Sequence, residues 1–275
     1  MHLVAAVGIL VGWASPAVCQ AKAGDRTTIS VESTMDVEIM VRDGSGAGEI
    51  KKLLNLLRRE TFEQEALAVT DGMVSSARIK VLSSTLQKSG SDTRLEENPT
   101  ALADQTYTST RGTWGWAAVD SDGGAAPAEG ATLGAWNDAG WLVPKEGPKA
   151  GAQWDVEAAK LAALISPAGL REASGKITCT CRGVEGSRAS IVFAGSLSGK
   201  GARDDTQIKV TIKAGILEYD LAKGRPVMVS LSGSYDSILS IEDVSRKPNE
   251  NVEERQKIGE IQVRSRKLEA KFDFK

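Results

Sequence analysis

The sequence predicts a mainly antiparallel β protein with a few short helices. Long tracts alternate apolar and polar residues, which is the spacing of strands that bury one face. Short glycine-containing turns separate these tracts, as in hairpins. At 275 residues the chain can bury a substantial core, either as one large domain or as two related β-rich halves. We therefore expect long curved strands that form a sandwich or a partial barrel.

Residues 1–23 predict a signal peptide, because an apolar core over residues 3–14 is followed by small residues suited to cleavage. The segment before this core holds no Lys or Arg, which leaves open whether Met1 is the true start and where cleavage occurs. Lipid attachment at Cys19 is disfavoured, because the Val before it is larger than the residue usual at that position. We expect an exported protein, secreted or held in the periplasm or cell envelope, with no transmembrane span in the mature chain.

The N-terminal β-rich half, residues 24–145, begins with one long strand. Its apolar residues occupy alternate positions, while acids occupy the other face. These apolar residues are Ile29, Val31, Met35, Val37, Ile39 and Val41. Apolar residues at helical spacing over 50–57 then predict a short helix. A tight turn at Thr70-Asp71-Gly72 leads into a returning strand over 75–86.

The remainder of this half is predicted to be less regular. Residues 89–98 are interpreted as a polar connection, and residues 107–119 as a hairpin around Gly112. A loop over 120–130, rich in Gly, Ala and Pro, precedes a helical segment over 131–142. The half therefore ends in a helix rather than in a strand.

The stretch 151–156 is predicted to join the two halves. Asp155 is suited to cap a helix over 156–165, since its side chain can accept from the free backbone N–H groups of the first turn. The C-terminal β-rich half, residues 146–275, is therefore expected to open with a short helix. Trp154 is expected to pack between the two halves.

The C-terminal half shows the clearest alternation of apolar and polar residues. Strands and glycine turns recur over 177–231, a polar segment without predicted structure covers 242–255, and a final strand covers 258–274. The apolar face switches at Gly215 and again near Arg266-Lys267, which predicts a β-bulge at each place. Hairpins in the two halves are similar, so a distant duplication is a further hypothesis.

Charge and histidine content argue against several classes of function. Lys plus Arg number 34 against 36 Asp plus Glu, so no overall basic field exists to hold nucleic acid. The single histidine, His2, lies in the predicted signal, which leaves the mature chain without an imidazole for catalysis or metal binding. The loop over 120–123 begins like a calcium loop but lacks the later acids. We expect no nucleic-acid partner, no metal and no cofactor, and favour a protein that is not an enzyme.

Cys179 and Cys181 are the cysteines that remain after the predicted signal. They lie two positions apart in an alternating run, so they share one face of a strand and are poorly placed to bond each other. We interpret them as small buried apolar residues and expect no disulfide.

The candidate binding residues are Trp114, Trp116, Trp136 and Trp141. Flat indole faces suit sugar rings or an apolar ligand. The alternative is that these side chains cap one end of the β core. Adjacent acids, Glu96-Glu97 and Asp204-Asp205, fall in predicted polar loops and are interpreted as solvated turn residues. No catalytic residue is assigned.

Several short motifs occur in the middle and the second half of the chain. They are Leu142-Val143-Pro144, Gly151-Ala152-Gln153-Trp154, Tyr219-Asp220 and Gly224-Arg225-Pro226. Together they resemble a pattern in uncharacterised secreted proteins of planctomycete-type bacteria, in which a Leu-Pro segment precedes Gly-x-x-Trp and a β-rich half follows. The usual Leu-Leu-Pro is Leu-Val-Pro here. The resemblance implies an exported envelope protein and carries no activity to transfer.

These observations favour a non-enzymatic periplasmic or cell-envelope protein that binds a hydrophobic ligand or a protein partner. Long curved sheets can enclose an apolar ligand, as in lipocalin-like barrels and bacterial lipoprotein carriers, although this is an analogy of fold alone. One alternative is a carbohydrate-binding or carbohydrate-active protein that uses surface tryptophans and a carboxylate pair. A purely structural envelope protein is the other alternative. An apolar cavity would favour the first hypothesis.

Overall fold

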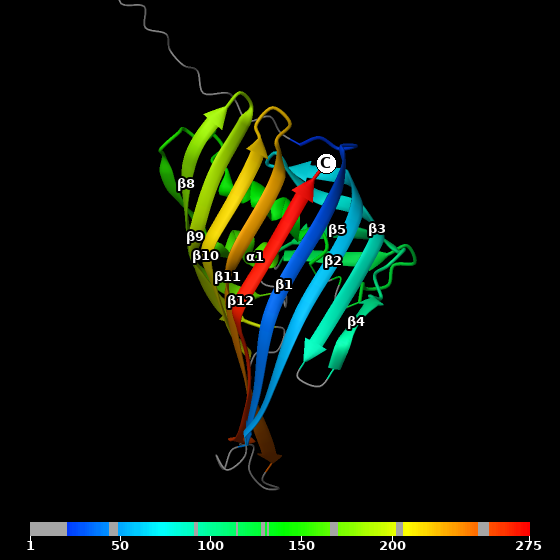
Figure 1. Cartoon of the computed structure of the whole chain (residues 1–275), viewed down its shortest axis with the longest axis vertical. Helices are drawn as coiled ribbons and strands as arrows, with labels where there is room; N and C mark the ends of the chain where they lie inside the picture. The colour runs from blue at the N-terminus through cyan, green and yellow to red at the C-terminus, as the bar shows by residue number, and fades with distance from the viewer. Residues whose placement is uncertain are drawn as a thin grey trace, which may run out of the picture.

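The computed structural model describes residues 21–43, 49–90, 93–113, 115–127, 130, 132–165, 170–201, 206–246 and 253–275. In these ranges the strands form one antiparallel 12-stranded sheet that curves strongly and does not close on itself (Figure 1). In the same ranges the helical segments that accompany the sheet are short. The predicted mainly β fold with long curved strands and few helices is therefore confirmed, in the form of a partial barrel. Residues 1–20, which hold most of the predicted signal and Cys19, lie outside the described residues.

The elements follow one another in a simple order. In chain order they are β1 (Arg26–Asp43), β2 (Glu49–Thr70), β3 (Met73–Gly90), β4 (Thr93–Pro99), β5 (Thr106–Gly112), β6 (Gly115–Asp120), η2 (Ala135–Leu142), β7 (Gln153–Glu157), η3 (Ala158–Leu161), α1 (Ala162–Ile165), β8 (Arg171–Glu185), β9 (Arg188–Lys200), β10 (Thr206–Asp220), β11 (Arg225–Arg246) and β12 (Glu253–Phe274). Within the described ranges, every helix is too short or too polar to cross a lipid bilayer.

The chain builds the sheet as two meanders that meet in the middle. The first runs outward from β1 through β2, β3 and β5 to the edge strand β6, with β4 paired to β3. The chain then crosses to the opposite edge, β7, and returns through β8, β9, β10 and β11 to β12. Strand β12 pairs with β1, and these strands lie side by side in the centre of Figure 1. Strands of both predicted halves thus belong to one sheet.

The crossing segment between β6 and β7 covers the concave face of the sheet. Its 3-10 helix η2 contacts β3 and β11, which lie on opposite sides of the central β1–β12 pair. The following η3 contacts β8 and β9, and α1 contacts β6. The apolar face of the curved sheet is therefore buried under short helices, as a one-sided sheet requires in water.

Both predicted β-bulges are confirmed by the strand registers. Asp36 of β1 pairs with Lys267, but the next residue, Val37, pairs with Ser265, so Arg266 has no residue opposite it. In β10 the pairing with β11 shifts between Ile212 and Ala214, directly before Gly215. An inserted residue switches which face of the strand is buried, and this restores the inward direction of the apolar side chains.

The helix predicted over residues 50–57 is wrong, because this segment lies inside β2. Strand β2 pairs with β1 along nearly its whole length and with β3 from Leu54 onward. Hydrogen bonds from neighbouring strands outweigh the helical spacing of four apolar residues. Ile50 and Leu53 are 70% and 56% exposed, so the spacing does not mark a buried helical face. The tight turn at Asp71-Gly72 is confirmed, with both residues at positive φ.

The helix predicted over residues 156–165 is shorter than expected. Val156 and Glu157 belong to the edge strand β7, and helical structure begins only at Ala158. Asp155 does not cap a helix; its carboxylate accepts a hydrogen bond from Thr178 Oγ1 at 2.8 Å and pairs with Lys176 Nζ at 2.8 Å on the neighbouring β8. The carboxylate that the sequence predicts as a helix cap therefore binds side chains of the neighbouring strand instead.

Two segments predicted to lack regular structure are strands. Residues 93–99 form β4, and the described parts of 242–255 extend β11 and β12. Polar side chains can enter a strand where its neighbour supplies the backbone hydrogen bonds. The predicted hairpin at 107–119 is confirmed, and so is a helical segment, η2, within 131–142. The glycine turns predicted within 177–231 include the one at Gly186, which joins the paired strands β8 and β9.

Cys179 and Cys181 are free and fully buried on the concave side of β8, which confirms their interpretation as small apolar residues. Burial raises the pKa of the Cys179 thiol to about 12, and burial also raises the pKa of the Cys181 thiol. Both thiols therefore stay protonated in the native protein at neutral pH.

Substitution of Gly233 on β11 tests the close approach between β10 and β11. A Cβ at this position would meet the backbone oxygen of Thr211 on β10. We expect Gly233→Ala to lower the free energy of unfolding by about 1–3 kcal/mol, as for other overpacking changes. The control is Gly183→Ala, because no atom lies within 4 Å of a Cβ built there. Equal stability of the two variants in denaturant titrations would contradict the described register of β10 and β11.

Candidate functional site

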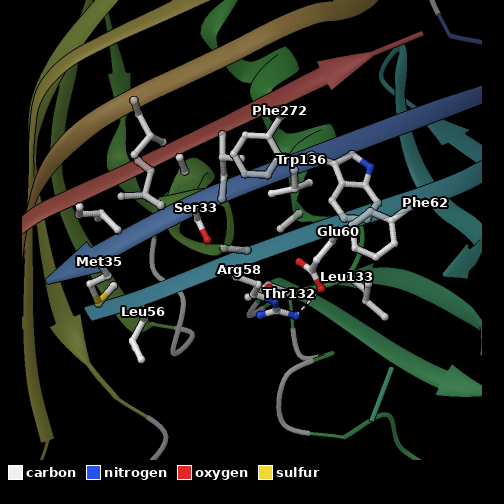
Figure 2. A pocket seen from close by; sticks show the side chains of 18 of the residues that line it. Ser33, Met35, Leu56, Arg58, Glu60, Phe62, Thr132, Leu133, Trp136 and Phe272 are labelled. Atoms are coloured by element: carbon white, nitrogen blue, oxygen red, sulfur yellow. Dashed lines mark hydrogen bonds and ion pairs between the residues drawn. The ribbon is translucent and has the colours of Figure 1, made fainter. Parts of the chain in front are cut away.

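A cavity of about 290 Å³ lies between the concave face of the sheet and the segment that covers it (Figure 2). Its lining is mainly apolar and comes from β1, β2, β3, β11 and β12, from Thr100 after β4, from the crossing segment and from α1. The lining residues are Val31, Ser33, Met35, Leu56, Arg58, Glu60, Phe62, Leu86, Thr100, Thr132, Leu133, Ala135, Trp136, Ala163, Leu164, Ile165, Leu231, Leu268, Ala270 and Phe272. Cavities of this size and character are typical of sites for small apolar ligands.

Two stacked aromatic rings form one end of this cavity. The rings of Phe62 on β2 and Trp136 on η2 have centroids 4.9 Å apart and an interplanar angle of 27°. Figure 2 shows both side chains at the same end of the cavity. Both are almost fully buried, so their stacking joins the covering segment to the sheet.

Hydrogen bonds from Gln64 fix the position of Trp136. The indole Nε1 of Trp136 donates to Gln64 Oε1 at 2.6 Å. The amides of Gln64 and Asn137 also exchange two hydrogen bonds, each of 3.0 Å. Gln64 follows Phe62 on the inward face of β2 and is buried. The polar groups of η2 are thus satisfied by the sheet, which keeps the aromatic wall of the cavity in place.

A small polar cluster lies on the sheet side of the cavity. Arg58 Nη2 donates to Glu60 Oε1 at 2.7 Å, and the two side chains are drawn together in Figure 2. Ser84 Oγ donates to the same carboxylate oxygen at 2.8 Å. Thr100 Oγ1 in turn donates to Ser84 Oγ at 2.6 Å. Glu60 and Ser84 are both buried, so this chain of hydrogen bonds supplies the partners that a buried carboxylate requires.

A second buried carboxylate, Asp138, anchors η2 to the edge of the sheet. Asp138 Oδ1 accepts from Arg111 Nε of β5 at 2.7 Å and from Trp116 Nε1 of β6 at 3.2 Å. Burial raises the pKa of Asp138 above its ordinary value of 3.8, while Arg111 opposes this rise. Asp138 does not line the main cavity, so its role here is to hold η2.

The structure brings three of the four candidate tryptophans to the covering segment and to the edge strand beside it. Trp136 lines the main cavity, and Trp116 is buried against Asp138. Trp141 lies under Lys160 and Arg111, whose charged groups are 4.9 and 5.5 Å from the centre of its ring. Trp114 lies outside the described residues. Of the three described candidate tryptophans, Trp136 alone lines the main cavity.

Trp141 belongs to a second cavity, of about 480 Å³, which runs along the edge strand β7. Trp154 and Tyr219 line the same cavity together with Asp155, Glu157 and Lys160. Trp154 is half-buried, and its Nε1 donates to Leu142 O at 3.2 Å, at the end of η2. This second cavity is more polar than the first, since charged side chains form much of its wall.

The residues that the sequence analysis missed lie mainly on β2. Leu56, Arg58, Glu60 and Phe62 all point to the cavity because they occupy alternate positions of one strand. The helix expected over 50–57 concealed this pattern. The signal that could have revealed it is the even-numbered set that continues through Gln64 and Ala66, both of which are buried. No local pattern marks the pairing of Arg58 with Glu60 as part of a cavity.

The acid pairs noted in the sequence do not converge on this site. Glu97 accepts a hydrogen bond from Thr85 Oγ1 at 2.9 Å on the exposed side of β4, and the pair at 204–205 lies outside the described residues. In the described part of the chain, no group of three or more His, Cys, Asp or Glu side chains is placed to hold a metal ion.

Comparison of the sequence with protein-family models and with curated proteins found no match.

Asp138 gives the protein a pH-dependent contribution to stability. Because its pKa is raised in the native state, the folded chain holds this proton more tightly than the unfolded chain. As the pH rises from 3.8 through the raised pKa, the wild type is expected to lose stability relative to Asp138→Asn. Arg111 stays charged throughout this range. Loss of its partner in Asp138→Asn therefore changes the free energy of unfolding by an amount that does not vary with pH. Denaturant unfolding across the acidic range measures this change.

Asp155→Asn provides the control for this measurement. Hydrogen bonds from Lys176 and Thr178 lower the pKa of Asp155, so its contribution to stability is present above pH 3.8 and is lost as the pH falls. The stability difference between wild type and variant should therefore change with pH in opposite directions for the two aspartates. Parallel slopes would contradict the burial of Asp138.

Proposed function

We propose that this protein binds a small hydrophobic molecule in the cavity between the sheet and its covering segment, and that it does so as an exported protein of the periplasm or cell envelope. The observation that carries the proposal is the cavity itself: mainly apolar side chains from five strands, from the crossing segment and from α1 line about 290 Å³ of space. Apolar cavities as small as about 150 Å³ bind benzene in other proteins, so this volume suffices for a ligand. The proposed role is binding without catalysis.

The organisation of the lining supports ligand binding over a purely structural role. A structural core gains stability by filling its interior, because voids forfeit dispersion contacts. Here Phe62 and Trp136 are held by stacking and by Gln64 so that they border space instead of filling it. These contacts thus hold the sheet and the covering segment in positions that leave the cavity between them unfilled.

Carbohydrate binding is less well supported by the positions of the tryptophans. Stacking on a sugar requires an indole face that a solvated ring can reach. Trp116 and Trp136 are 7% and 4% exposed, respectively. The ring of Trp141 already lies under two cationic groups. These environments favour an apolar ligand beside Trp136 over a sugar on the protein surface.

Filling the cavity is expected to abolish ligand binding. Ala270 of β12 lines the cavity, so Ala270→Leu would place three more carbon atoms inside it. We expect the affinity for phenylnaphthylamine, a neutral apolar fluorophore, to fall by about tenfold or more, the equivalent of about 1.4 kcal/mol. Energy transfer from the tryptophans to the bound fluorophore measures the affinity, since Trp136 lines the same cavity.

The matched control is Ala194→Leu, which makes the same change at an exposed position of β9. This variant should bind the fluorophore as the wild type does. An equal loss in both variants would show that the probe binds elsewhere. No binding by the folded wild type would overturn the proposed function.

A further inference from the structure

Among the described residues that line the main cavity, the charged groups are Arg58 and Glu60. They lie two positions apart on the inward face of β2 and form an ion pair of 2.7 Å between Nη2 and Oε1. The two opposite charges of this pair form a dipole in the cavity wall. The other polar lining residues, Ser33, Thr100 and Thr132, are neutral.

Glu60 is held in place from two strands. Oε1 accepts from Arg58 on β2 and from Ser84 Oγ on β3, and Ser84 is itself tied to Thr100. Ser84 is 1% exposed and Glu60 is 8% exposed. The carboxylate can therefore not swing away into solvent without giving up these hydrogen bonds. Its negative charge is a fixed feature of the cavity wall.

A fixed carboxylate disfavours an anionic ligand. The head group of a fatty-acid anion could reach the guanidinium of Arg58 only beside Glu60 or by displacing it. The first arrangement places like charges next to each other, and the second leaves Glu60 buried without its cation. A hydroxyl, ester or amide group can instead hydrogen-bond to the ion pair while both charges stay matched.

We propose that the cavity selects uncharged amphiphiles: molecules with an apolar chain or ring system and one neutral polar group that contacts the Arg58–Glu60 pair. This inference rests on the proposed function and specifies the chemical class of its ligand. The apolar part fills the space among Phe62, Trp136 and Phe272, and the polar part lies against β2.

Dodecanol and dodecanoate test this selectivity, because they share a chain and differ in the charge of the head group. Each competes with phenylnaphthylamine for the wild-type protein above neutral pH, where the acid is ionised. We expect dodecanol to bind at least about tenfold more tightly than dodecanoate, given the cost of placing like charges together. Wild-type binding of dodecanoate that equals or exceeds that of dodecanol would overturn the proposal.

Changing one charge of the pair should reverse the preference. Glu60→Gln removes the negative charge that opposes an anion beside Arg58, so dodecanoate should gain affinity over dodecanol. The double variant Arg58→Gln with Glu60→Gln removes both charges and should retain the preference for dodecanol. Glu63→Gln, the same change at an exposed position of the same strand, should behave as the wild type.

The outcomes separate this inference from the proposed function. If phenylnaphthylamine does not bind the folded wild type, the proposed function fails. If the probe binds but the two competitors are equal, or neither displaces it, only the selectivity for neutral amphiphiles fails. If Glu60→Gln does not fold, the wild-type comparison of the two competitors still decides the matter. An unchanged preference in folded Glu60→Gln would also contradict the role of the ion pair.

Discussion

The pairing of β1 with β12 is the interaction on which the rest of this structure depends. It joins the first and last strands of the chain, in a register that runs from Ile29 opposite Phe274 to Asp43 opposite Gly259. Each meander alone would end in an open edge with unpaired backbone groups at this position. Their union makes one broad sheet whose twist produces the concave face. Because the two strands are so distant in sequence, this pairing carries a large loop-closure cost.

A broad open sheet with an apolar concave face must be covered, and the crossing segment is fixed to the sheet at three places. Gln64 holds Trp136 and Asn137 from β2, Arg111 and Trp116 hold Asp138 from the β5–β6 edge, and Trp154 of β7 holds the end of η2. Longer helices are held on a sheet by regular side-chain packing, whereas here side-chain hydrogen bonds hold the short helix η2 in place. They fix the cover at a distance from β1, β2 and β12 that leaves the cavity between them.

The cavity combines an apolar lining with one neutralised ion pair, and this combination connects the fold to the proposed function. Apolar walls supply most of the free energy available for binding, roughly in proportion to the area that a ligand removes from water. In the proposed role, the Arg58–Glu60 pair would supply discrimination, because a buried pair penalises any ligand that disturbs its charge balance. The tryptophans contribute as walls and anchors of the covering segment.

The sequence by itself determined the elements whose signals are local. Alternation identified β1, the strands of the second half and both bulges, glycine marked the tight turns, and spacing placed Cys179 and Cys181 on one buried face. The tertiary structure alone decided that residues 50–57 are a strand, because pairing with β1 over the whole segment and with β3 from Leu54 onward outweighs a helical spacing of apolar side chains. It likewise decided that Asp155 pairs across the sheet, and that Arg58, Glu60 and Trp136 share one cavity. These outcomes depend on which distant segments meet, and such contacts leave no periodic pattern in the chain.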